Sequence, residues 1–188
     1  MNLYLIRHTT LAISSGICYG QSDVDVSENF AIEGAKLREK LAHVQFDVVY
    51  SSPLQRCSKL ASALSLGEVR VDERLKELHF GDWEMQAWAD IPRNVFDFWA
   101  SDYANLAPPN GESFSQLHAR SVRFLEEVSS HLPGRNVAVI THGGVIRALL
   151  AEALNMPLKG LFRMVIDHAS VTHISFDEAV PKIHFVNR

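Results

Sequence analysis

The 188-residue chain contains little cysteine, and this excludes two classes of site. Cys18 and Cys57 lie far apart and belong to no C-x-x-C pair or Cys/His cluster, so neither a zinc site nor a redox motif is expected. Unpaired, reduced thiols fit a cytoplasmic protein. A chain of this length buries roughly 70% of the surface of its unfolded form, so a single domain over residues 1–188 needs no disulfide or structural metal.

Long apolar runs and clusters of basic residues are also missing. No apolar stretch approaches the ~18 residues of a membrane helix, and the apolar residues at the start follow no basic leader of the secretory type. The net charge is -4, and basic residues are scattered singly. We therefore expect a cytoplasmic protein with no membrane and no nucleic-acid partner. The oligomeric state stays open, a homodimer included.

The chain does contain apolar runs that alternate with helical patterns. Short buried strands are expected at residues 3–6, 47–50, 69–71 and 137–140. Amphipathic helices are expected at residues 30–44, 113–132 and 145–154, with a further helix starting at residues 51–53. A pair of edge strands is expected between residues 164 and 186, separated by residues 177–181. This alternation predicts a three-layer α/β/α sandwich with a mostly parallel sheet.

Two further local predictions concern a helix cap and an insertion. Ser27 is expected to cap the helix that starts at residue 30. Residues 83–112 hold many aromatic side chains and are broken by Pro92 and by residues 108–109, so a small cap domain is expected there. Its tryptophans could pack the cap against the body or stack on an aromatic ligand.

Two of the predicted strands end in a histidine. Arg7 and His8 follow the first strand, and Thr141 and His142 follow the strand at residues 137–140. In open α/β sheets, ligands bind beyond the carboxyl ends of the strands. The sequence therefore predicts one crevice that both histidines share.

The neighbours of these histidines suit phosphate chemistry. Arg7, and Arg56 in a first helical turn, supply positive charge, while turns at Gly20 and Gly143 supply backbone N–H donors. A neutral imidazole, with an ordinary pKa of about 6.5, can attack phosphorus and form a covalent intermediate. Either histidine could be this nucleophile. Glu77 is a candidate to protonate the leaving oxygen and then to activate water.

Four segments together resemble one family. They are residues 5–8 (LIRH), 50–56 (YSSPLQR), 75–84 (LKELHFGDWE) and 140–147 (ITHGGVIR). In this order and over nearly the whole chain, they are similar to the motifs of the histidine phosphatase, or phosphoglycerate mutase-like, superfamily. The resemblance implies a three-layer sandwich with a cap inserted after the acid loop.

The resemblance also implies roles for individual residues. It makes His8 the nucleophile and Glu77 the proton donor, and it implies that the phosphoryl group is bound by Arg7, Arg56 and His142. Backbone donors at Gly20 and Gln21 are implied as secondary contacts, and Gly143 is expected as a further donor from its turn. No metal and no cofactor is implied, and the partner is a phosphorylated small molecule.

The loop after His8 departs from the family pattern and also suggests a substrate. Family members usually carry R-H-G-x-T and then an asparagine, whereas here Thr9 follows His8 and Ile13 stands where the asparagine would fall. Residues 16–23 (GICYGQSD) are similar to this loop in alpha-ribazole phosphatases of cobalamin synthesis, which makes alpha-ribazole 5'-phosphate the expected substrate. A broad-specificity phosphatase, a phosphoglycerate mutase and a catalytically silent binding module remain alternatives.

Overall fold

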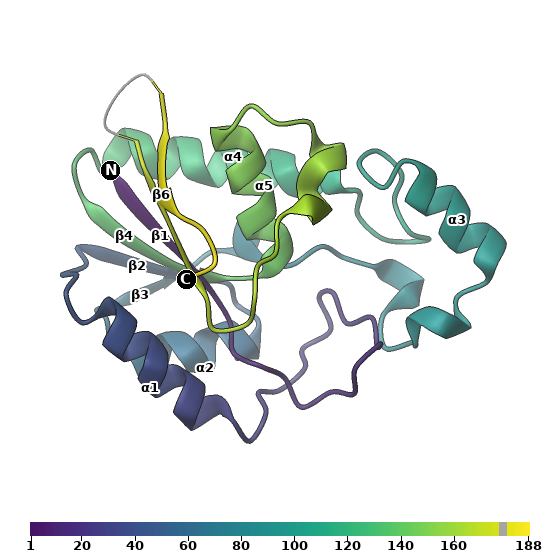
Figure 1. The fold of residues 1–188 in the computed structure, drawn as a ribbon, viewed down its shortest axis with the longest axis horizontal. Coiled ribbons are helices and arrows are strands. Elements are labelled where there is room, and N and C mark those ends of the chain that lie inside the picture. The colour runs from purple at the N-terminus through teal and green to yellow at the C-terminus, as the bar shows by residue number, and fades with distance from the viewer. Residues whose placement is uncertain (177–179) are drawn as a thin grey trace.

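The computed structural model describes residues 1–176 and 180–188, and its centre is a six-stranded sheet (Figure 1). The strand order is β3-β2-β4-β1-β5-β6. The strands are β1 (Asn2–Arg7), β2 (Val48–Ser51), β3 (Val69–Val71), β4 (Asn136–Thr141), β5 (Val171–Ser175) and β6 (Lys182–Phe185). The first four are mutually parallel, whereas β5 runs antiparallel to β1 and β6 antiparallel to β5.

Helices cover both faces of this sheet, which confirms the predicted three-layer α/β/α sandwich. One face carries α1 (Phe30–Leu41) and α2 (Gln55–Leu64), and the other carries α4 (Phe114–His131) and α5 (Gly143–Ala153) (Figure 1). Parallel strands covered on both faces must be apolar throughout. In agreement, every residue of β4 after Asn136 is buried.

Two sequence predictions were wrong in detail. The N-cap position of α1 is Asn29 instead of Ser27, and the Asn29 side chain makes no capping hydrogen bond. The Ser27 hydroxyl accepts from the Asn29 N–H at 3.3 Å in the turn just before the helix. Strand β5 is not an edge strand, because it pairs with both β1 and β6. Its nearly continuous burial matches this interior place. Of the predicted connection at residues 177–181, residues 177–179 lie outside the described part of the chain.

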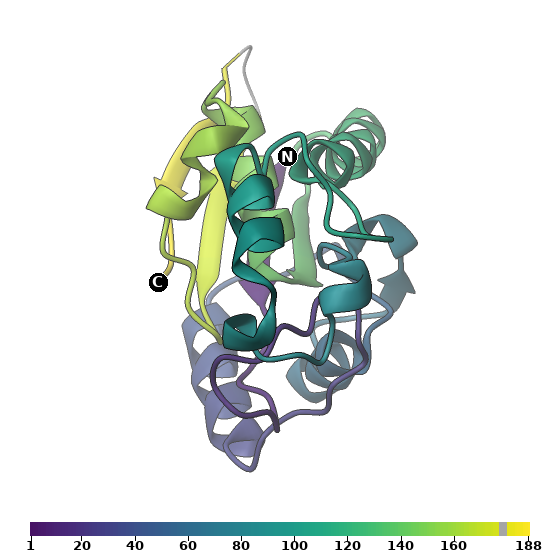
Figure 2. The same cartoon turned by 90° about the vertical axis from the view of Figure 1, so that its right-hand side faces the viewer.

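The aromatic segment forms short elements beyond the carboxyl end of the sheet. They are η2 (Gly81–Trp83), η3 (Trp88–Asp90) and α3 (Arg93–Ser101), which lie at the same end of the molecule as the long loop after β1 (Figures 1 and 2). Trp83 and Trp99 are buried against each other, with ring centroids 5.4 Å apart. Trp88 is only partly buried. Within residues 1–176 and 180–188, no helix is both long and apolar enough for a membrane span.

Candidate active site

The two histidines predicted to share a crevice lie side by side. Strands β1 and β4 are parallel neighbours with Arg7 opposite Thr141, so His8 and His142 leave the sheet at the same edge. Their ring centroids are 5.2 Å apart, and the two residues are 1% and 0% exposed. The pairing of the two rings therefore depends on the register of two strands that lie far apart in the sequence.

The hydrogen bonding of His8 leaves one ring nitrogen free to attack. Its Nδ1 lies 2.8 Å from the carbonyl oxygen of Thr9, which can only accept, so the proton belongs on Nδ1. Nε2 then keeps its lone pair. Burial, together with the positive charges of Arg56 and Arg7, holds the pKa of His8 well below its usual value. The ring is thus neutral and nucleophilic at physiological pH.

Arg56 is fully buried, and all three of its guanidinium nitrogens are used. Its Nη1 donates to the Ser22 carbonyl at 2.8 Å, and its Nη2 donates to the Gly20 carbonyl at 2.6 Å. Its Nε donates to Nδ1 of His142 at 3.2 Å. None of these partners carries a negative charge, so the guanidinium keeps its attraction for an anion.

Arg7 is held by the segment that precedes β5. Its Nη1 donates to the Ile166 carbonyl, and its Nη2 lies 3.0 Å from Nε2 of His168. Its Nε is buried and has no hydrogen-bond partner among the described residues. Buried donors are normally satisfied, so this N–H is available to a ligand.

His168 is a site residue that the sequence did not reveal. Its ring centroid lies 5.2 Å from that of His8, as close as that of His142. Its position just before an antiparallel strand was the only signal, and the sequence does not show that this strand pairs with β1.

His142 contacts the protein through both ring nitrogens. Because Arg56 donates to its Nδ1, the proton belongs on Nε2, which lies 2.8 Å from the hydroxyl of Ser52. Burial and the charge of Arg56 lower its pKa far below the usual value. In this arrangement His142 is a neutral ring that packs on His8 and orients Arg56.

Glu77 is fixed against the start of α5. Its carboxylate accepts from the backbone N–H groups of Leu78 at 2.9 Å and Gly144 at 3.1 Å. A Cβ at Gly144 would lie 2.1 Å from the Glu77 Oε1, so only glycine allows this approach. Gly144 is therefore a second residue that the sequence analysis did not select for the site.

The loop at Gly20 and Gln21 is held by a carboxylate that the sequence analysis also missed. Glu84 accepts from the backbone N–H groups of Gln21 (2.8 Å) and Phe80 (3.0 Å), and it also accepts from the N–H and hydroxyl of Ser22. The Gln21 side chain donates to the Glu77 carbonyl at 2.9 Å. The Gln21 N–H, predicted to face phosphate, is therefore bonded to Glu84.

The guanidinium groups of Arg7 and Arg147 both lie close to Gly143. A Cβ there would lie 3.0 Å from Nη1 of Arg147 and 3.4 Å from Nε of Arg7. Arg147 Nε donates to the Met164 carbonyl at 3.0 Å, while its Nη atoms donate no hydrogen bond within the described ranges. The edge of the site thus carries a further cation.

Together these groups form an anion-binding centre. Arg7 and Arg56 have no carboxylate within ion-pair distance in the described part of the chain, and the two buried histidines beside them are neutral. A doubly charged phosphate matches the buried Arg56 and the partly buried Arg7, two unneutralised cations next to a free imidazole nitrogen. No group of three or more metal-ligating side chains occurs among residues 1–176 and 180–188.

Known proteins share this architecture. The chain is 28% identical to the adenosylcobalamin/alpha-ribazole phosphatase of Salmonella typhimurium, covering 100% of this chain and 96% of the relative. It is 28% identical to phosphoserine phosphatase 1 of Hydrogenobacter thermophilus, covering 95% and 88%. The solved alpha-ribazole phosphatase of Shigella flexneri superposes with a TM-score of 0.92 at 26% identity, covering 100% and 96%. The family model of the histidine phosphatase superfamily (branch 1) matches residues 3–188, and the chain belongs to this superfamily.

Proposed function

We propose that this phosphatase works without a metal, through a phosphohistidine on His8, and that its substrate is alpha-ribazole 5'-phosphate. The observation that carries the chemistry is the free Nε2 of a buried, neutral His8 close to Arg7 and Arg56, neither of which pairs with a carboxylate among the described residues. We place the enzyme in the cytoplasm, where its two buried free thiols would persist.

The proposed reaction is a double displacement. Nε2 of His8 attacks phosphorus in line, the bond to the ester oxygen breaks, and Glu77 gives that oxygen a proton. Arg7 and Arg56 stabilise the charge on the equatorial oxygens. The Glu77 carboxylate then removes a proton from water, which attacks the phosphohistidine and releases inorganic phosphate and His8.

Two features support an aromatic ribotide as substrate. Full-length relatives are named alpha-ribazole phosphatases, and residues 16–23 resemble the loop of that subfamily. This loop is joined to the aromatic segment, since Trp88 N–H donates to the Gly16 carbonyl at 2.9 Å. Trp88 is only partly buried, whereas Trp83 and Trp99 are buried. We therefore propose Trp88 as the tryptophan that stacks on the benzimidazole base.

A second candidate substrate is a phosphorylated hydroxy acid or amino acid. The observation that favours it is Arg147, whose Nη donors lie beside Arg7 and could bind a carboxylate next to the phosphate. A relative of similar identity is named phosphoserine phosphatase 1.

The deciding experiment compares kcat/KM for alpha-ribazole 5'-phosphate, O-phosphoserine, 3-phosphoglycerate and phenyl phosphate, with His8→Ala as control. We expect a preference of about a hundredfold or more for the ribotide, lost in His8→Ala and reduced about tenfold in Trp88→Ala. A preference for O-phosphoserine that Arg147→Met removes would establish the second candidate instead. Activity that survives His8→Ala would overturn the phosphohistidine mechanism.

A further inference from the structure

The segment between residues 166 and 170 closes the site from the side of β5. Because β5 is antiparallel to β1, its start lies at the carboxyl end of β1. The segment is tied there by backbone hydrogen bonds, from Ala169 N–H to the His8 carbonyl (3.1 Å) and from Arg7 N–H to the Ser170 carbonyl (3.0 Å). His168 is thereby fixed relative to both Arg7 and His8.

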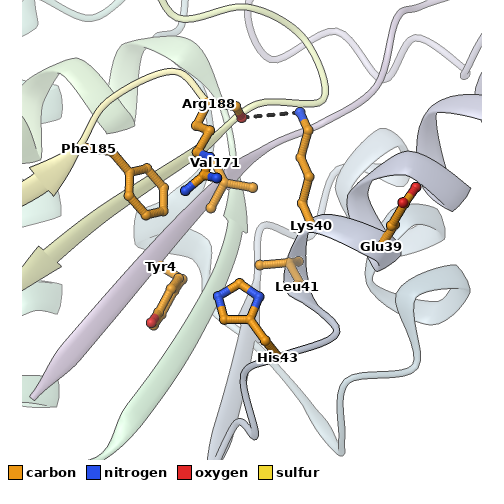
Figure 3. Close-up of a pocket in the computed structure, with 8 residues that line it drawn as sticks. All are labelled: Tyr4, Glu39, Lys40, Leu41, His43, Val171, Phe185 and Arg188. Atoms are coloured by element: carbon orange, nitrogen blue, oxygen red, sulfur yellow. Dashed lines mark hydrogen bonds between the residues drawn. The ribbon is translucent and has the colours of Figure 1, made fainter.

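The same segment is also braced from outside the site. Lys40 on α1 lines a cavity of about 240 Å³ together with Tyr4, Phe185 and Arg188 (Figure 3). Its Nζ donates to the Ala169 carbonyl at 3.3 Å and to the Arg188 carbonyl at 3.2 Å. The backbone that carries His168 is therefore supported by both α1 and β1.

The bond between His168 and Arg7 has a defined direction. A guanidinium can only donate, so Nε2 of His168 accepts from Nη2 of Arg7 and the imidazole proton belongs on Nδ1. Burial and the charge of Arg7 lower the pKa of His168 to about 4, which keeps this acceptor neutral.

A neutral acceptor has a specific advantage at this place. A carboxylate would orient the guanidinium equally well, but it would also neutralise the charge that attracts phosphate. The imidazole and the Ile166 carbonyl fix two of the three Arg7 nitrogens without adding negative charge. The third, Nε, is buried and has no hydrogen-bond partner in the described part of the chain.

We propose that His168 is a positioning residue that orients Arg7 for the phosphoryl group by accepting its Nη2–H bond while leaving its charge intact. The inference rests on the proposed function, because it takes Arg7 as a phosphoryl ligand. It adds a third histidine to the site, one that acts on the substrate through Arg7.

A double-mutant cycle tests this role, with inhibition by orthovanadate and hydrolysis of phenyl phosphate as the two measurements. We expect His168→Ala to raise the vanadate inhibition constant and to lower kcat/KM by about ten- to a hundredfold, the range for a lost hydrogen bond to a charged group. In an Arg7→Ala background, the same substitution should change either quantity less than about twofold.

Matched variants separate orientation from packing. His168→Asn keeps an acceptor and should stay within about threefold to fivefold of the parent, whereas His168→Phe keeps the ring and should fail like alanine. His168→Asp should weaken vanadate binding because it neutralises Arg7. His118→Ala removes a histidine on α4 that pairs with Glu152, and it should leave both measurements unchanged.

The outcomes also separate this inference from the proposed function. Equal losses from His168→Ala with and without Arg7, or full activity in His168→Phe, would overturn the positioning role while His8-dependent hydrolysis stands. If the parent enzyme shows no hydrolysis that depends on His8, both the proposed function and the positioning role would be overturned. Equal thermal unfolding midpoints for the Asn and Phe variants would assign their difference in activity to the acceptor.

Discussion

At the scale of single residues, the site depends on which atoms carry protons. Thr9 fixes the proton of His8 on Nδ1, and Arg56 fixes that of His142 on Nε2. The Thr9 carbonyl can only accept a hydrogen bond and the Arg56 guanidinium can only donate one, so the nitrogen of His8 that we propose as nucleophile is set before any ligand arrives. The proposed mechanism thus depends on hydrogen-bond partners that lie within the core.

The proposed role of Glu77 predicts a dependence on the leaving group. Glu77→Gln should lower kcat for an alkyl phosphate by about a hundredfold to ten-thousandfold, the usual contribution of a general acid or base. For 4-nitrophenyl phosphate, whose leaving group needs no proton, the loss in the rate of phosphohistidine formation should be less than about tenfold. Rapid-quench measurement of the phosphoenzyme checks this. Equal losses for both substrates would contradict the assignment of Glu77.

Gly144 offers a prediction that depends on one methyl group. Gly144→Ala should displace the Glu77 carboxylate, because the new Cβ would lie 2.1 Å from its Oε1. We expect kcat to fall nearly as far as in Glu77→Gln, and the two losses should not add in the double variant. Gly34→Ala on α1 is a suitable control, since its Cβ would meet nothing within 4 Å. Steady-state kinetics of Gly144→Ala, Glu77→Gln and the double variant measure these losses. Losses that add in the double variant would show that the contact is unimportant.

At the scale of elements, helix termini support the site. Helix α4 begins with a capping box, in which the Ser113 hydroxyl accepts from the Gln116 N–H at 3.3 Å and the Gln116 side chain accepts from the Ser113 N–H at 2.8 Å. The adjacent Arg120 donates to the carbonyls of Lys76 and Glu77. The start of α4 therefore fixes the backbone of the acid loop.

Removing the Ser113 cap should lower the stability of the protein and leave its catalytic activity nearly unchanged. Ser113→Ala should lower the free energy of unfolding by about 1 kcal/mol, because it removes the side-chain acceptor of the Gln116 N–H and so breaks the capping box. Ser113→Asp keeps an acceptor and should lose less. Urea denaturation measures both, and kcat/KM should change less than about twofold. An unchanged free energy in Ser113→Ala would contradict a stabilising capping box.

At the scale of the whole molecule, three neutral histidines in one core link folding to pH. The pKa of His8, His142 and His168 is lowered in the folded state, mainly by burial. The unfolded chain binds protons at these positions from about pH 6.5 downward, whereas the folded protein does not. The stability that these histidines contribute is therefore fully present above about pH 6.5, and it is lost as the pH falls through and below that value.

We predict a decline in the free energy of unfolding between pH 7 and pH 5.5. Each of the fully buried His8 and His142 should contribute about 1 kcal/mol over this range. Urea denaturation at several pH values measures the slope. His8→Gln should make the slope shallower, and the exposed His43→Gln should leave it unchanged. A slope that is the same in all three proteins would show that other groups cause the decline.

The sequence by itself determined much of this molecule. Apolar runs that end in Arg7-His8 and Thr141-His142 predict strands and their polar ends, because local pattern and burial decide those elements. The motifs carry His8, Arg56 and Glu77 with them. Only the tertiary structure decided that β5 pairs with β1, which brings His168 onto Arg7, and that Glu84 folds back onto the loop at Gln21. His168 follows Arg7 by 161 positions, and Glu84 follows Gln21 by 63 positions. No local sequence pattern encodes a contact over such a separation.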